Sequence, residues 1–281
     1  MNVVLKFIKK SYCSYVKNQK KLRFVFLMLF CTLIFAVGVF VGVSIEHNKN
    51  NGGNIHNKQN IDGSKIEEDL SNSGDNALQF GEEVKVVIDP GHGGEDLGAV
   101  KDDLYEKDLN LDICLKMGKY LEAIDINVVY TREKDIDVGL DERVNIANGI
   151  DATLFISVHN NYMPNHSGYM GTETLYCSPL KVDEDKMDGE KLAIIVQNKL
   201  ANTLKTVDNG VIHRPNLVVL RKTKMPAVIA EVAYMSNSSD RANLLDEEFR
   251  NNAAKALAES VMEALDFMKV EKNEEGKWIT K

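Results

Sequence analysis

Cysteine is scarce in this chain of 281 residues: there are four, and only Cys114 and Cys177 lie beyond the first 45 positions. Two cysteines cannot build a disulfide framework, and they are too few for a closed zinc site made of thiolates. We expect both to be small core residues, and the sequence leaves open whether they pair.

Basic residues are concentrated at the start of the chain and in deficit elsewhere. The first 45 residues hold seven lysines and arginines and no acid, so the overall charge of −8 leaves −15 on residues 46–281. Binding to phosphate backbones needs clustered lysine and arginine. The acidic body therefore predicts no nucleic-acid partner.

Long apolar runs are also absent, with one exception. Residues 24–45 form a run of 22 residues without a charge, and about 20 apolar residues span a bilayer as a helix. All seven nearby positive charges precede the run, so residues 1–23 should be a basic cytoplasmic N-terminus and the remainder should lie outside. We expect a single-pass signal-anchor. The alternative is a cleaved signal peptide and a secreted protein.

The amino-acid composition of the chain changes twice after this run. Residues 46–80 are rich in Asn, Gly, Ser and charge and poor in aromatics, which predicts a flexible linker. Residues 81–270 have the pattern of a folded domain, and residues 271–281 are expected to be a polar tail.

Short apolar strands alternate with amphipathic helices in the domain. The expected strands cover residues 84–89, 126–130, 153–158, 172–176, 217–220 and 227–232, and the expected helices cover 106–124, 140–148, 190–204 and 248–268. This alternation predicts one α/β domain with a mostly parallel sheet. Active sites in such sheets lie at the carboxyl ends of the strands.

Four metal-capable or acidic residues fall at that edge. His92, His159 and Glu231 each come at the end of an expected strand, and Glu106 opens the first helix. Two histidines and one glutamate, with a fourth position left open, are a common catalytic zinc set. A second carboxylate is then needed to move protons. We expect His92, Glu106 and His159 to hold the metal and Glu231 to transfer protons.

Each residue also has a plainer interpretation. His92 could be a turn histidine in a Gly-rich loop, and His159 a hydrogen-bonded core histidine. Glu106 ends a stretch, Asp103 to Glu106, that resembles a helix capping box. Glu231 lies in a fully apolar strand, where a carboxylate must be paired, protonated or bound to metal. The convergence of all four residues favours the metal site.

The order of motifs resembles the Amidase_3 family of N-acetylmuramoyl-L-alanine amidases over about residues 84–268. The matching stretches are D-P-G-H-G-G at Asp89–Gly94, D-x-G-A at Asp96–Ala99, E-K-x-x-N-L at Glu106–Leu111, T-R at Thr131 and Arg132, R-x-x-x-A-N at Arg143–Asn148, S-(I/V)-H-x-N at Ser157–Asn161, and P-A-x-x-x-E at Pro226–Glu231 followed by Ser236 and Asn237.

The resemblance implies a single three-layer α/β domain with about six strands in its sheet, here preceded by one transmembrane helix. It also implies one Zn²⁺ per chain on His92, Glu106 and His159, with Glu231 as catalytic glutamate. The substrate would be peptidoglycan, cut between N-acetylmuramic acid and L-alanine. Asn110, Arg132 and Asn161, which lie in the same motifs, are candidate substrate contacts.

The domain layout is similar to the CwlD type of this family, which acts on spore cortex. One departure is Asn209, which stands where the family usually has arginine. We expect this change either to weaken a substrate contact or to be made good by an activating partner protein. Two other functions stay open: a different zinc peptidase of the cell wall, and a poorly active peptidoglycan-binding protein.

Overall fold

The computed structural model describes residues 81–178 and 183–280, all within one structural unit. The basic start, the expected span over residues 24–45 and the expected linker over 46–80 lie outside these residues. Within the described part of the chain, no helix has the length and apolar character needed to cross a bilayer.

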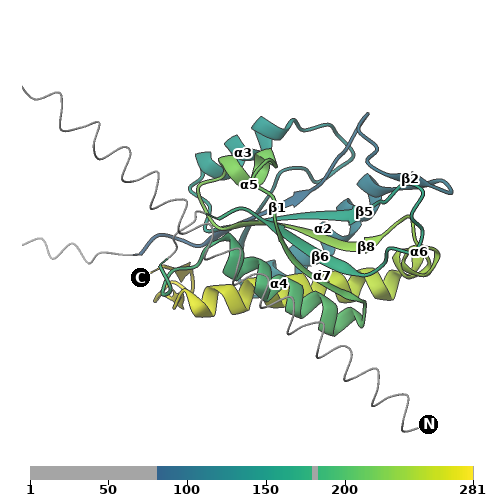
Figure 1. Cartoon of the computed structure of the whole chain (residues 1–281). Coiled ribbons are helices and arrows are strands. Elements are labelled where there is room, and N and C mark those ends of the chain that lie inside the picture. The colour runs from purple at the N-terminus through teal and green to yellow at the C-terminus, as the bar shows by residue number, and fades with distance from the viewer. Residues whose placement is uncertain (1–80, 179–182, 281) are drawn as a thin grey trace, which may run out of the picture. The chain divides into compact units, whose positions relative to one another are not determined.

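A six-stranded sheet forms the centre of the domain (Figure 1). Its spatial order is β4-β1-β5-β8-β6-β7, and every neighbouring pair is parallel except β8 and β6. The strands are β1 (Lys85–Pro90), β4 (Asn127–Tyr130), β5 (Leu154–Asn161), β6 (Thr172–Tyr176), β7 (Asp208–His213) and β8 (Ala227–Tyr234). The mostly parallel six-stranded sheet expected from the sequence is confirmed.

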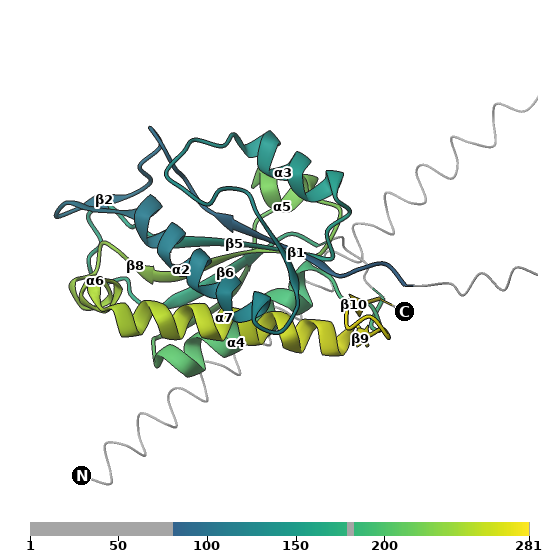
Figure 2. The same cartoon turned by 180° about the vertical axis from the view of Figure 1, so that it is seen from behind.

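Helices cover both faces of this sheet, which gives three layers (Figures 1 and 2). One face carries α2 (Glu106–Glu122), α4 (Gly189–Leu204) and α7 (Glu247–Phe267), and the other carries α3 (Leu140–Gly149) and α5 (Val218–Lys222). The larger core lies under α2, α4 and α7, and includes the buried Ile113, Met117 and Leu121 of α2. Their spacing of three and four residues is the helical repeat seen in the sequence.

One expected strand is wrong. Residues 217–220 do not form a strand; the helix α5 occupies Val218–Lys222. A short apolar run has no periodicity that separates a strand from a buried helical turn. The sixth strand is instead β7, an edge strand with no buried residue, which therefore lacks the apolar signal of a central strand.

Small elements complete the domain. A short hairpin joins β2 (Val100–Lys101) to β3 (Leu104–Tyr105), and α6 (Ser238–Leu245) follows β8. Residues 271–280, expected as a polar tail, contain a second hairpin of β9 (Glu271–Lys272) and β10 (Trp278–Ile279). The Trp278 indole donates to the carbonyl of Ile124 at 2.9 Å, so this segment is fastened to the domain.

Candidate active site

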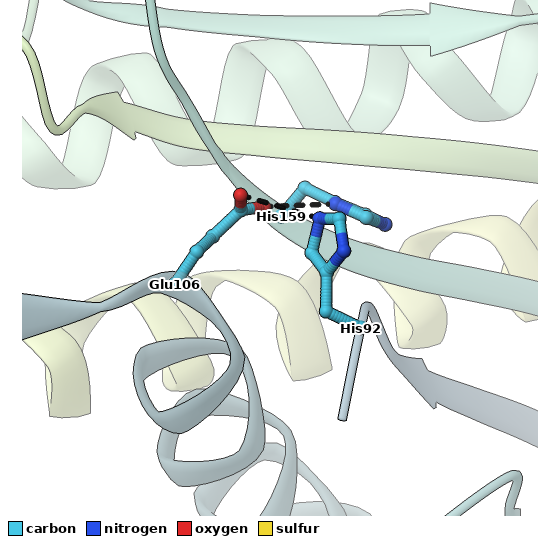
Figure 3. Close-up of side chains that lie close together, drawn as sticks. All are labelled: His92, Glu106 and His159. Carbon is cyan, nitrogen blue, oxygen red and sulfur yellow. Dashed lines mark hydrogen bonds and ion pairs between the residues drawn. The ribbon is translucent and has the colours of Figure 1, made fainter. Parts of the chain in front are cut away.

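His92, Glu106 and His159 come together at the carboxyl ends of β1 and β5 (Figure 3). One ligand atom from each lies within 4.8 Å of the others. Glu106 Oε2 is 3.2 Å from His92 Nε2, and Glu106 Oε1 is 2.9 Å from His159 Nδ1. Three side chains from a turn, a strand and a helix start therefore point at one place.

Glu106 is held at this place by the backbone. Its carboxylate accepts from the N–H of Ala99 at 2.8 Å and from the N–H of Asn160 at 3.2 Å. The N-cap residue of α2 is Tyr105, and no side chain makes a capping hydrogen bond at this end of the helix. The capping-box interpretation of Glu106 is therefore wrong. Burial alone would raise the pKa of Glu106, but hydrogen bonds to His159 and His92 hold it well below its usual range. The group is therefore an anionic carboxylate.

His92 is oriented by a second carboxylate. Its Nδ1 lies 2.8 Å from Asp96 Oδ2, which leaves Nε2 facing Glu106. A carboxylate behind a histidine is the usual outer partner of a metal ligand. Burial lowers the pKa of His92, but Glu106 and Asp96 outweigh burial and raise it to about 9. A metal needs neutral imidazole, so a metal ion at this site would compete with protons.

The turn that carries His92 needs small residues and an unusual backbone. His92 has φ of 62°, in the left-handed region that few non-glycine residues adopt. A Cβ on Gly91 would meet the His159 ring at 2.2 Å, and a Cβ on Gly98 would meet the His92 ring at 2.6 Å. The glycines of the two motifs therefore let both histidines and Glu106 approach each other.

Two buried arginines fasten this turn by its carbonyl oxygens. Arg143 donates to the carbonyls of His92 at 2.8 Å and Pro90 at 2.7 Å. Arg132 donates to the carbonyls of Pro90 at 3.0 Å and Gly91 at 2.9 Å. Every residue from Pro90 to His92 is thus held by a guanidinium.

Arg143 is itself paired with Asp89 inside the domain. Its Nη1 lies 2.6 Å from Asp89 Oδ1, and Thr131 and Ser157 hydroxyls also donate to that carboxylate at 2.6 and 2.7 Å. All these groups are buried. A buried carboxylate in this setting depends on its positive partner.

We expect Arg143→Met to weaken both the fold and the metal site. Removal of one member of a buried pair costs about 3–5 kcal/mol of unfolding free energy, and loss of an outer contact typically lowers metal affinity about 10- to 100-fold. Denaturant unfolding and zinc titration measure the two effects. Lys222→Met, which breaks an exposed pair with Asp141, should cost less than about 1 kcal/mol. Equal effects in both variants would contradict this role of Arg143.

Glu231 lies beside the metal-capable cluster but is not part of it. It pairs with His159 in the register of β8 against β5. Its Oε2 is buried and has no hydrogen-bond partner among the described residues. Burial, together with the negative charges of Glu106 and Glu173, raises the pKa of Glu231 to about 7. A carboxyl that titrates near neutral pH with a free oxygen is suited to proton transfer.

A cavity of about 250 Å³ opens beside the two histidines. The loop before α3 and the start of α5 form its apolar wall. The lining residues include Asp137, Val138, Leu140, Leu217, Val218 and Val219, with His92 and His159 at one side. The residues mistaken for a strand at 217–220 therefore supply part of the wall beside the cluster.

The three candidate substrate contacts have different surroundings. Asn110 and Arg132 are buried, and their side chains donate to backbone carbonyls of the His92 turn. Asn161 is partly exposed, and its amide donates to Glu173 at 2.7 Å. Substrate contact stays a prediction for all three, and Asn161 is the one whose side chain reaches the surface.

The sequence named the three residues that the structure places together, but it did not reveal the residues that support them. Asp96 and Arg143 lie in the quoted motifs, yet nothing in their spacing says that one backs His92 and the other holds its carbonyl. Glu173, which accepts from Asn161, has no local signal, because the antiparallel pairing of β6 with β8 determines its position. Only the three-dimensional structure shows these contacts.

The geometry defines an α/β protein with a cluster of two histidines and one glutamate that could hold a metal ion at the carboxyl ends of its strands. A family model described as N-acetylmuramoyl-L-alanine amidase matches residues 86–263. The chain belongs to this family, Amidase_3, and is an N-acetylmuramoyl-L-alanine amidase acting on peptidoglycan.

Known proteins are similar over the same region. The amidase LytC of Bacillus subtilis is 37% identical over 61% of this chain, which spans 34% of LytC. The catalytic domain of CwlV from Paenibacillus polymyxa is 36% identical, with a TM-score of 0.60, over 66% of this chain and 99% of that domain. The CwlD amidase of Clostridioides difficile, solved in complex with the GerS lipoprotein, is 28% identical with a TM-score of 0.58, over 66% and 99%.

Proposed function

We propose that amide hydrolysis by this protein depends on one zinc ion held by His92, Glu106 and His159. The donor chemistry supports this assignment, because two imidazoles and a carboxylate suit Zn²⁺ and leave a position for substrate. The single observation that carries the proposal is the approach of three ligand atoms to within 4.8 Å of one another.

Zinc, when bound, would supply Lewis acidity that polarises the scissile carbonyl and makes water a better nucleophile. Glu231 takes the proton of the attacking water at its free Oε2 and returns it to the leaving nitrogen of L-alanine. Asp96 keeps the His92 ring in place, and the N–H groups of Ala99 and Asn160 keep Glu106 in place. The cavity beside His92 and His159 gives the substrate room next to the two histidines.

The products of digestion test this function. Purified residues 81–281, loaded with zinc, should release stem peptides that begin with L-alanine from peptidoglycan, as read by mass spectrometry. A cut within the stem peptide would support the rival zinc peptidase. Full release by protein stripped of zinc would overturn the metal proposal, and no release in either state would favour the non-catalytic binding protein.

We also propose that residues 24–45 anchor the protein in the membrane, with the N-terminus in the cytoplasm and the amidase domain outside. The uncharged run and the seven preceding positive charges support this topology. Protease added to intact protoplasts should remove the domain and spare residues 1–23. Protein found only in the medium would favour the cleaved signal peptide.

Spore cortex is the peptidoglycan that we propose as substrate in the cell. Similarity to the CwlD amidase and the expected layout of one anchor and one amidase domain support it. LytC and CwlV are more similar in sequence, so the cellular role needs its own test. Deletion should leave more stem peptides attached to N-acetylmuramic acid in spore cortex and leave vegetative wall composition unchanged; the reverse pattern would refute the cortex role.

A partner protein that activates the amidase is the last part of the proposal. The CwlD amidase was solved with the GerS lipoprotein, and Asn209 here replaces the arginine usual in the family. Asn209 lies on the edge strand β7 and donates to the carbonyl of Met170. Turnover by the purified protein at the rate seen in cell extract would argue against an activator.

A further inference from the structure

Glu173 lies next to the catalytic carboxylate but has no part in the mechanism above. The register of β5, β8 and β6 places His159, Glu231 and Glu173 in one row across three neighbouring strands. Glu173 is buried, so its oxygens need hydrogen-bond partners from the protein.

Two donors fill both oxygens of Glu173. The Asn161 side-chain amide donates to Oε1 at 2.7 Å, and the Tyr234 hydroxyl donates to Oε2 at 3.1 Å. Burial and the neighbouring Glu173 raise the pKa of Tyr234, so its hydroxyl keeps the proton that it donates. Because Asn161 is on β5 and Glu173 on β6, their hydrogen bond crosses over β8, which carries Glu231.

The backbone on either side of the Glu173–Tyr234 pair is held by a buried carboxylate. Asp240 is buried, and its Oδ2 accepts from the N–H of Tyr234 at 2.9 Å and from that of Gly171 at 2.8 Å. Asp240 therefore holds the backbone of Tyr234, which donates to Glu173, and the backbone of Gly171, which lies two residues before Glu173.

The chemistry of Glu173 dictates which end of the Asn161 amide faces outward. A carboxylate oxygen accepts a hydrogen bond from the NH₂ end of an asparagine, and Glu173 Oε1 accepts from that end of Asn161. The Asn161 oxygen must then point away from Glu173. Asn161 is partly exposed and follows the metal-ligand residue His159 by two positions, so this oxygen is available to a substrate donor.

We infer that Glu173 is a positioning residue that turns the oxygen of Asn161 toward the substrate, where it accepts a hydrogen bond from an amide N–H of peptidoglycan. This inference rests on the proposed function. The site would then require a substrate with an N–H donor at one fixed place beside Glu231. Glu173 would act through Asn161 and would not touch the substrate.

The variant Glu173→Gln tests the inference in the full-length protein. Glutamine has the same shape, but one of its ends donates, so Asn161 is free to turn its oxygen inward. The contact is present in both bound substrate and transition state, so its loss should raise KM about tenfold and change kcat less than about threefold. Zinc content should stay at the wild-type value. The matched control is Glu190→Gln, which alters a Glu190–Tyr176 pair at the other end of β6 and should leave KM unchanged.

A double variant separates positioning from general damage. In Asn161→Asp combined with Glu173→Gln, the glutamine donates to the new aspartate, and the other aspartate oxygen still faces the substrate as an acceptor. KM should return to within about threefold of wild type. Any one of four results would overturn the inference. Three concern Glu173→Gln: a wild-type KM, a loss of zinc, or a fall in kcat alone. The fourth is no recovery of KM in the double variant.

Two competitors identify the source of the N–H. Free stem peptide and free N-acetylmuramic acid are compared as inhibitors of the wild type and of Glu173→Gln, and the one that weakens in the variant supplies the donor. If neither competitor inhibits the variant more weakly than the wild type, the inference is wrong. Failure of the wild-type protein to release stem peptides would instead refute the proposed function, so the two failures are distinguishable.

Discussion

Glu231→Gln should bind one zinc ion per chain and lose about 10³-fold in kcat. The substitution keeps the shape of the side chain and removes the group that takes and returns the proton, a contribution of about 10²- to 10⁴-fold in other enzymes. Zinc should remain because Glu231 lies beside the three ligand residues and is not one of them. Single-turnover digestion of purified muropeptides, with metal analysis of the same sample, measures both quantities.

The control for this experiment is Glu259→Gln, an exposed glutamate on α7. It makes the same chemical change far from the cluster, so kcat and zinc content should equal those of the wild type. Wild-type turnover in Glu231→Gln would remove Glu231 from the mechanism. Loss of zinc in that variant would make Glu231 a ligand and would require a different proton carrier.

His159→Ala should lose zinc and activity together. The variant removes one of three ligands and also the ring that Glu106 contacts at 2.9 Å. Zinc bound after dialysis should fall from about one ion per chain to less than about a tenth, and stem-peptide release should fall to background. Elemental analysis and product mass spectrometry on one preparation give the two readings.

His213→Ala is the matched histidine control. His213 is exposed at the end of β7 and contacts the ring of Tyr176, so its removal should change neither zinc content nor activity. If His159→Ala kept a full complement of zinc, the ligand assignment would be wrong. If it lost zinc but kept full activity, hydrolysis would not depend on the metal.

The sequence predicts the cluster well because each of its residues has a local signal that topology then combines. His92 follows the apolar strand β1, His159 lies near the end of the apolar strand β5, and Glu106 opens a helix. Parallel strands bring such positions to a common edge without any knowledge of side-chain contacts. Most of the sheet and its helices follow from the same alternation of short apolar runs.

What the sequence does not predict depends on contacts across the fold. Residues 217–220 carry an apolar run that suits a strand as well as a helix, and only the packing of α5 against α3 and β8 selects the helix. The edge strand β7 has no buried residue to reveal it. Glu173 gains its role from an antiparallel pairing that no pattern within β6 indicates.

Zinc anomalous scattering from crystals of residues 81–281 would locate the metal. We expect one strong peak at about 2.0–2.2 Å from a nitrogen of His92, a nitrogen of His159 and an oxygen of Glu106, with Glu231 outside bonding distance. A peak bound elsewhere, or one that Glu106 or either histidine does not reach, would contradict this ligand assignment.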